Sequence, residues 1–233
     1  STEGANQSTT GTCTDVAGNT TPDTQTGINI DLTKPVVPVF IGITANDSFV
    51  FGSVPTAASI SCESSDLLSG LNSAGCVVTG YSDLVSGTGQ HTLTAKAIDV
   101  AGNEQTATLK YTVTAWTLNG FYKPVDMGML NTVKSGSTVP LKFEVFAGTT
   151  TELTSTTVVK SFTTQQVSCQ NFAQEIEAPI EVTTTGGTVL RYDGTGGQFI
   201  QNWQTPKGKA GSCYKVTMTT QDGSTIVADF LLK

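Results

Sequence analysis

The chain has 233 residues, a formal net charge of −7 at pH 7, 37% hydrophobic residues and 13% charged residues. Residues 1–115 hold three lysines against ten acidic residues, whereas residues 116–233 hold nine charges of each sign. No basic stripe is present that could neutralise phosphates, which argues against a nucleic-acid partner. No apolar run approaches the roughly 18 residues of a membrane helix, so we expect no membrane insertion.

The first predicted element is a hairpin within residues 1–31. The motif DVAGN occupies residues 15–19 and returns at residues 99–103, an offset of 84. The aspartate side chain can accept backbone N–H bonds, and glycine and asparagine tolerate the positive φ of a bulged hairpin turn. The first copy therefore predicts the last two strands of a unit whose complete copy follows.

The complete copy spans residues 35–115 and shows the period-two alternation of half-buried strands. We expect strands near residues 36–43, 57–63, 75–81, 91–99 and 105–113, which is the count and spacing of an immunoglobulin-like sandwich. Pro35 and Pro38 interrupt strand pairing and mark residues 1–34 as a partial unit with a hinge. The fold class predicted for the whole chain is all-β, with tandem sandwiches of which the first is incomplete.

Two resemblances refine this organisation. DVAGN, GINIDLTKP and the segment ISCESSDLLSGLNSAGCVVTGYSD resemble the repeated bacterial Ig-like domains of secreted and cell-surface proteins. The stretch from Trp116 onward is similar to the bacterial PxKF domain, with Pro140-Leu141-Lys142-Phe143 as its signature. The resemblances imply an Ig-like unit over residues 35–115, a C-terminal β-sandwich over residues 116–233, and no activity that could be carried over.

The five cysteines indicate in which cellular compartment the protein resides. Without a neighbouring histidine or a CxxC pair they argue against zinc, and two local pairs are expected, Cys62 with Cys76 and Cys169 with Cys213. Paired cysteines in a threonine-rich β protein indicate an extracellular location, either secreted or at the cell surface. Cys13 is left unpaired or finds an external partner. The bacterial Ig-like resemblance also implies the Cys62–Cys76 bridge.

The single histidine and the acidic residues are the candidates for catalysis and metal binding. His91 is the only histidine and opens a surface strand, so no nucleophile has a histidine base beside it, and we predict no catalytic residues. Calcium suits the acidic, oxygen-rich loops better. Candidate calcium ligands are Asp15, Asp66 and Asp99, with Asp31 or Asp47 near the hinge, although no spacing matches a defined calcium loop and Asx turns explain the same residues.

Aromatic residues offer one candidate ligand platform. Phe199 and Trp203 fall on the same side of a predicted strand, with Tyr192 near them, and exposed rings can stack on sugars. The same residues could instead fill a sandwich core.

The fragment at residues 1–31 is too small to bury a core of its own. Its missing strands could precede it in the same protein, it could dock on the chain's own sandwich, or it could join another molecule. We predict the last: a non-enzymatic stalk or filament subunit that self-associates head to tail by strand complementation. The alternative is a glycan- or cell-wall-binding accessory module of a larger secreted protein. No cofactor is expected beyond structural Ca²⁺.

Overall fold

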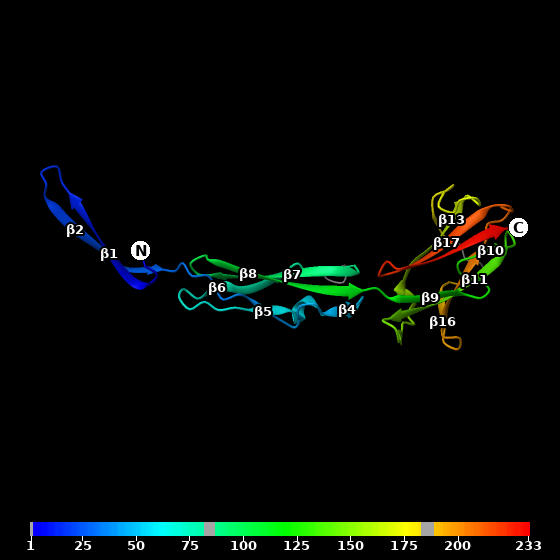
Figure 1. Cartoon of the computed structure of the whole chain (residues 1–233), viewed down its shortest axis with the longest axis horizontal. Helices are drawn as coiled ribbons and strands as arrows, with labels where there is room; N and C mark the ends of the chain where they lie inside the picture. Colours follow the sequence, from blue (N-terminus) through cyan, green and yellow to red (C-terminus); the bar gives the residue numbers. More distant parts are fainter. Residues whose placement is uncertain (1, 82–86, 183–188) are drawn as a thin grey trace. The chain divides into compact units, whose positions relative to one another are not determined.

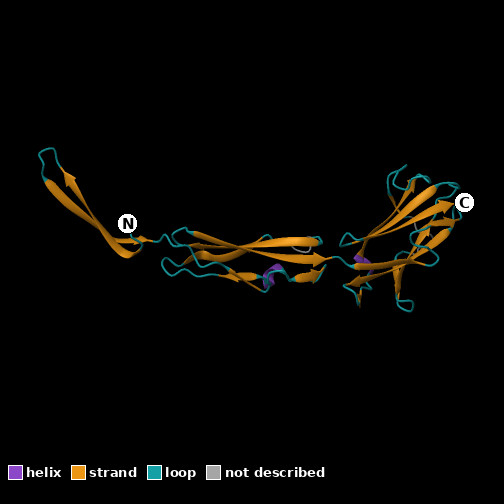
Figure 2. Ribbon diagram, viewed as in Figure 1, coloured by secondary structure: helices purple, strands orange, loops and turns teal. Residues whose placement is uncertain are grey.

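The protein is all-β, as its alternating sequence predicts. The computed structural model describes residues 2–81, 87–182 and 189–233, which consist almost entirely of strands and loops (Figures 1 and 2). Its contacts divide the chain into two compact units. The first takes residues 1–48, 54–86 and 90–112, and the second takes residues 49–53, 87–89 and 113–233.

The first unit begins with a long hairpin, coloured dark blue in Figure 1. Strands β1 (Gly4–Thr14) and β2 (Thr20–Ile30) pair antiparallel, with Thr10 opposite Thr24 and Cys13 opposite Thr21. They form a sheet of two strands, and within the described chain neither strand pairs with a third. Most of the hairpin's residues are exposed.

The complete Ig-like unit follows the hinge. A four-stranded sheet with the order β4-β8-β7-β6 accompanies the two-stranded sheet β3-β5. The strands are β3 (Val39–Ile41), β4 (Ser48–Val50), β5 (Ser61–Glu63), β6 (Leu71–Thr79), β7 (Gly89–Asp99) and β8 (Glu104–Thr114). Alternation along β7 and β8 places Leu93, Ala95, Ala97, Leu109, Tyr111 and Val113 in a thin core, to which Ile43 and Ile60 from the connecting segments add.

The sequence-predicted strands near residues 36–43 and 57–63 are too long. Only Val39–Ile41 pairs in the first segment, because Pro35 and Pro38 lack the N–H that a ladder needs. In the second, Ala57–Ser59 forms a 3-10 turn, and strand β5 begins at Ser61.

The second unit is a larger sandwich of two sheets, shown from green to red in Figure 1. One sheet has the order β10-β18-β17-β13-β14; the other has the order β12-β11-β16-β15, with β9 also paired to β11. The strands are β9 (Thr117–Tyr122), β10 (Leu130–Val133), β11 (Thr138–Ala147), β12 (Thr151–Glu152), β13 (Val159–Val167), β14 (Ile180–Glu181), β15 (Arg191–Asp193), β16 (Gln198–Gln204), β17 (Cys213–Thr220) and β18 (Thr225–Leu232). A 3-10 turn at Thr156–Val158 precedes β13.

The core of this sandwich is aromatic and fully enclosed. Phe143 lies opposite Phe199 on neighbouring strands, and their rings stack with centroids 5.1 Å apart. Trp203 packs against Phe230 from the other sheet at 4.8 Å. Burial of several such rings provides most of the hydrophobic stabilisation of a sandwich of this size.

Candidate interaction and metal sites

The two DVAGN turns have the same hydrogen-bond geometry. In the first, the Asp15 carboxylate accepts bonds from the backbone N–H and the side-chain amide of Asn19, both at 2.8 Å. In the second, the Asp99 carboxylate accepts the same two bonds from Asn103 at 2.7 and 2.8 Å. Each turn also closes with a bond from the aspartate N–H to the asparagine carbonyl. This pattern is a type I turn with a glycine bulge, so the repeated motif is a hairpin device.

The hairpin repeats the length and turn of strands β7 and β8 but not their apolar face. The core positions of the complete copy are Leu93, Ala95, Ala97, Leu109 and Tyr111. The residues 84 positions earlier are Thr9, Gly11, Cys13, Gln25 and Gly27, and all are exposed. The first copy therefore has little to contribute to a hydrophobic core.

The hydrogen bonds of the first turn determine which backbone groups of β1 point away from β2. Asp15 and Asn19 form a hydrogen-bonded pair, and such pairs alternate with non-hydrogen-bonded ones along an antiparallel ladder. Thr12 opposite Pro22 and Thr10 opposite Thr24 are therefore non-hydrogen-bonded pairs, whose backbone groups point outward. Pro22 lies on β2 with its backbone directed outward. Because proline has no N–H, the outer edge of β2 lacks a donor that a further strand would need. The β1 edge has no proline and no charged side chain.

The corresponding edge is occupied in the complete unit. Strand β6 pairs antiparallel with the outer edge of β7, with Val77 opposite Lys96 and Thr79 opposite Thr94. Thr10 and Thr12 are the counterparts of Thr94 and Lys96 at the 84-residue offset. The same strand position is thus paired in the second copy and unpaired, within the described chain, in the first.

Three carboxylates come together in the first unit. One carboxylate oxygen from each of Asp31, Asp66 and Asp99 lies within 4.8 Å of the others, and Asp99 is buried. The sequence named Asp66 and Asp99 and left Asp31 as an alternative with Asp47. Only the fold joins these three, because they come from the hinge, the Cys-bracketed loop and the second DVAGN turn. Of the three, Asp31 lines a cavity of about 470 Å³, together with Ile30, Leu68 and Val100.

Backbone donors hold this acidic cluster in place. One Asp66 oxygen accepts from the N–H groups of Leu68, Ser69 and Gly70 at 2.9–3.0 Å. Asp31 accepts from Ser69 N–H at 3.0 Å, and hydrogen bonding from Ser69 lowers the pKa of Asp31 below its ordinary value. The hydrogen bonds that orient these carboxylates thus come from backbone N–H groups and not from a cationic side chain.

The other calcium candidates lie elsewhere. The Asp15 carboxylate is engaged by Asn19, whose hydrogen bonds lower its pKa, and Asp15 joins no group of three ligands in the described residues. Asp47 accepts from the N–H and hydroxyl of Thr44 at 2.8 and 2.6 Å, which lowers its pKa. Both have the local geometry of Asx-type turns rather than a shared cation site.

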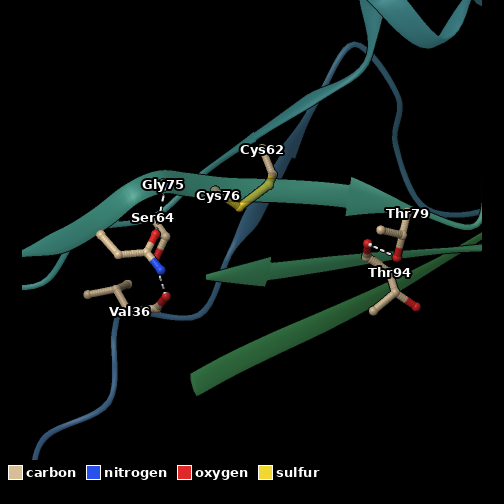
Figure 3. The surroundings of a disulfide bond; sticks show 8 residues. Val36, Cys62, Ser64, Gly75, Cys76, Thr79 and Thr94 are labelled. Atoms are coloured by element: carbon tan, nitrogen blue, oxygen red, sulfur yellow. Dashed lines mark hydrogen bonds between the residues drawn. A yellow bond between two sulfur atoms is a disulfide. The ribbon is translucent and has the colours of Figure 1, made fainter. Parts of the chain in front are cut away.

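The four expected cysteine partners are bonded as predicted. Cys62 and Cys76 form one disulfide, which connects β5 to β6, and Cys169 and Cys213 form the other. Figure 3 shows the first, with Ser64 and Val36 near it. The Ser64 hydroxyl donates to the Val36 carbonyl. Cys13 is a free, exposed thiol.

The expected aromatic platform is not at the surface. Phe199 and Trp203 are both 0% exposed and belong to the core. Tyr192 is half-buried; its hydroxyl donates to Glu152 at 2.7 Å, which raises its pKa to about 12. The period-two pattern placed Phe199 and Trp203 on one face correctly, but that face is covered by the opposing sheet.

The histidine weighed for catalysis has structural surroundings. His91 stacks on Tyr111 with ring centroids 5.2 Å apart.

Comparisons with known proteins give only distant matches. No family model and no curated protein matches the chain, so the PxKF assignment stays a prediction. The titin domains Z1Z2 in complex with telethonin align at 15% identity, covering 84% of this chain and 96% of theirs, with a TM-score of 0.23. A tetra-tandem repeat from the extending region of a large adhesion protein aligns at 14% identity over 98% of this chain and 66% of its own, with a TM-score of 0.28. Protocadherin gamma B7 cadherin domains 1–4 align at 8% identity over 100% and 65%, with a TM-score of 0.25.

These TM-scores are low over the whole chain, so the matched structures carry no argument about function. Where the structure describes the chain, no helix is long and apolar enough to cross a membrane. Two features were missed at the sequence level: the outward direction of the β1 backbone and a group of lysines in the second unit. The first was deducible from the turn type, and the second required the tertiary fold.

Proposed function

We propose that this protein is a non-enzymatic extracellular structural subunit of a cell-surface stalk or filament. The hairpin β1–β2 joins it to a neighbour by strand complementation. The observation that carries this proposal is the unpaired β1 edge, which presents the outward backbone groups of Thr10 and Thr12. A long strand edge without charge or proline is a template for adding another strand.

Three further features support the proposal. The equivalent edge of β7 is paired in the complete copy. The hairpin's faces are too polar to attach by hydrophobic packing alone. The two disulfides support an extracellular location, because disulfides form and persist in an oxidising environment.

The decisive experiment blocks one edge at a time. Thr12→Pro removes an outward N–H from β1, and we expect it to weaken self-association of the full chain in sedimentation velocity. Thr24→Pro removes an outward N–H from β2, beside the natural Pro22, and serves as the matched control that keeps wild-type association. Equal association of both variants and wild type would refute complementation through β1.

A deletion provides an independent check. Both cores are built from residues after the hinge, so a chain lacking residues 1–31 keeps its two sandwiches. We expect it to be monomeric, with the circular dichroism of folded β-sheet. Assembly that survives this deletion contradicts the proposal.

We also propose that the acidic cluster of Asp31, Asp66 and Asp99 binds Ca²⁺. Hard cations of this kind take carboxylate and carbonyl oxygens, and three carboxylates this close repel one another without a positive charge. Because Asp31 belongs to the hinge after β2, a bound ion would fix the base of the hairpin to the complete unit. A rigid base lowers the entropic cost of presenting the β1 edge to a partner.

The glycan-binding alternative loses its candidate site, because Phe199 and Trp203 are inaccessible. The structural role is therefore the function we retain.

A further inference from the structure

The second unit carries a compact group of lysines at the end of its sandwich. We define the basic end as Lys134, Lys207, Lys209 and Lys233, all of which are exposed. Ser135 connects them: its N–H donates to the Lys233 carbonyl at 2.8 Å, its hydroxyl donates to Pro206, and it accepts from Lys209 N–H at 3.2 Å. Glu177 offsets only Lys209.

A free strand edge lies beside the basic end. Strand β10 is the terminal strand of its sheet and pairs only with β18 in the described chain. Lys233 donates to the Val133 carbonyl and accepts from Ser135, so alternate residues of β10 face β18. Leu130 and Thr132 therefore turn their backbone N–H and C=O groups outward.

The side chains around this edge are also unusual for a soluble surface. Met129 is 68% exposed and Leu130 is 45% exposed. The free edge ends at Lys134, whose carbonyl is taken by the Thr205 hydroxyl at 3.0 Å. An apolar, unpaired edge that runs into a group of cations is suited to an acidic β-strand partner.

The hairpin has the complementary chemistry. Residues 1–33 contain the acids Glu3, Asp15, Asp23 and Asp31 and no lysine or arginine. Its free β1 edge offers outward groups at Thr10 and Thr12, as β10 does at Leu130 and Thr132. Strand β6, a terminal strand of the four-stranded sheet, contains no lysine or arginine that could attract the acidic hairpin.

We propose that the hairpin of one chain docks on the basic end of a second copy and adds β1 to the free edge of β10. This inference rests on the proposed function, because it names the acceptor that strand complementation needs. The donor and acceptor surfaces differ, so the contact is heterologous and propagates from chain to chain.

A charge-swap experiment on the full chain tests the docking. The end-reversed variant carries Lys134→Glu and Lys207→Glu. The hairpin-reversed variant carries Asp23→Lys and Gln25→Lys at two exposed residues that hydrogen-bond to each other, so the first turn and the acidic cluster stay intact. We expect each alone to associate at least about tenfold more weakly than wild type, because like charges then face each other. Mixing the two variants pairs opposite charges again and restores association. Lys110→Glu with Lys160→Glu is the control of equal charge change, made at exposed lysines outside the basic end.

The outcomes separate this inference from the proposed function. Wild-type association that weakens at high salt, with restoration in the mixture, supports the docking. If Thr12→Pro abolishes assembly while the end-reversed variant assembles normally, complementation stands and the β10 acceptor is wrong. Failure of the mixture to restore assembly also overturns the acceptor. Wild-type chains that stay monomeric at every concentration and salt overturn both.

Discussion

The backbone N–H of Trp116 donates to the carboxylate of Asp222 at 2.7 Å, although the two residues are 106 positions apart. Asp222 also accepts from the Thr220 hydroxyl and from Ser224. The bond ties the start of the second unit to the turn between its last two strands. Asp222 thus anchors the entry of the chain into the sandwich.

This anchor predicts an acid-sensitive second unit. Burial would raise the pKa of Asp222, but the bonds from Thr220, Trp116 and Ser224 outweigh burial and lower it. A carboxyl whose pKa is lower in the folded state stabilises the fold above its unfolded pKa of 3.8 and loses that contribution as pH falls through the folded value. Asp222→Asn should reduce the free energy of unfolding at neutral pH by about 1–3 kcal/mol. The free energy of unfolding of this variant should also fall less steeply than that of the wild type as the pH is lowered.

The measurement is chemical unfolding followed by tryptophan fluorescence from pH 7 to about 3. Both tryptophans, Trp116 and Trp203, belong to the second unit, so the signal reports on that unit alone. Asp126→Asn, at a half-exposed carboxylate paired with Lys123, is the control for the loss of one carboxylate from the same unit.

Trp203→Ala should destabilise the second unit by about 3–5 kcal/mol, because a fully buried ring is replaced by a cavity. Calorimetry of the whole chain would show the transition of this unit at a lower temperature. Tyr122→Ala truncates a ring that is 37% exposed and should cost much less. Equal losses in the two variants would show that Trp203 is not a core residue.

Gly42→Ala should destabilise the first unit more than Gly70→Ala, which lies in the same unit. Both glycines have a positive φ, at 83° and 75°, so both variants carry a conformational cost of about 1–2 kcal/mol. Only at Gly42 would the new Cβ lie 2.1 Å from a backbone oxygen, that of Ser59, whereas at Gly70 it meets open space. Thermal unfolding followed by circular dichroism would compare the two; a similar shift for both contradicts the close approach of the chain at Gly42.

Calcium should raise the melting temperature of the wild-type chain, since a ligand that binds only the folded state stabilises it by mass action. Asp31→Asn should abolish this rise, whereas Asp47→Asn, which lies outside the acidic cluster, should retain it. Isothermal titration with Ca²⁺ and then Mg²⁺ measures the binding directly. Unchanged titration curves for Asp31→Asn would exclude this residue as a ligand.

Much of the fold could be predicted from local pattern. Strands β7 and β8 follow from strict alternation about the second DVAGN turn, and both disulfides follow from the spacing of their cysteines. Strand β4, with three residues, contains too few alternations to be recognised, and the prediction for β3 extended beyond its three paired residues. Their pairing is decided by the neighbouring strand instead.

The candidate sites were less predictable, because they depend on contacts between distant segments. Asp31, Asp66 and Asp99 have no common spacing, and only the folded chain shows that Asp31 joins the other two. Phe199 and Trp203 share a face in any strand, but the sequence does not say whether a second sheet covers it. The 84-residue offset predicted the hairpin's turn and missed the polarity of its faces.

The parallel pairing of β10 with β18 has a mechanical consequence. Leu130 lies opposite Asp229 and Val133 opposite Leu232, so the two strands run side by side in the same direction. A pull on the chain before β10 and after β18 drags these strands past each other lengthwise. Their hydrogen bonds then bear the tension together instead of opening one after another.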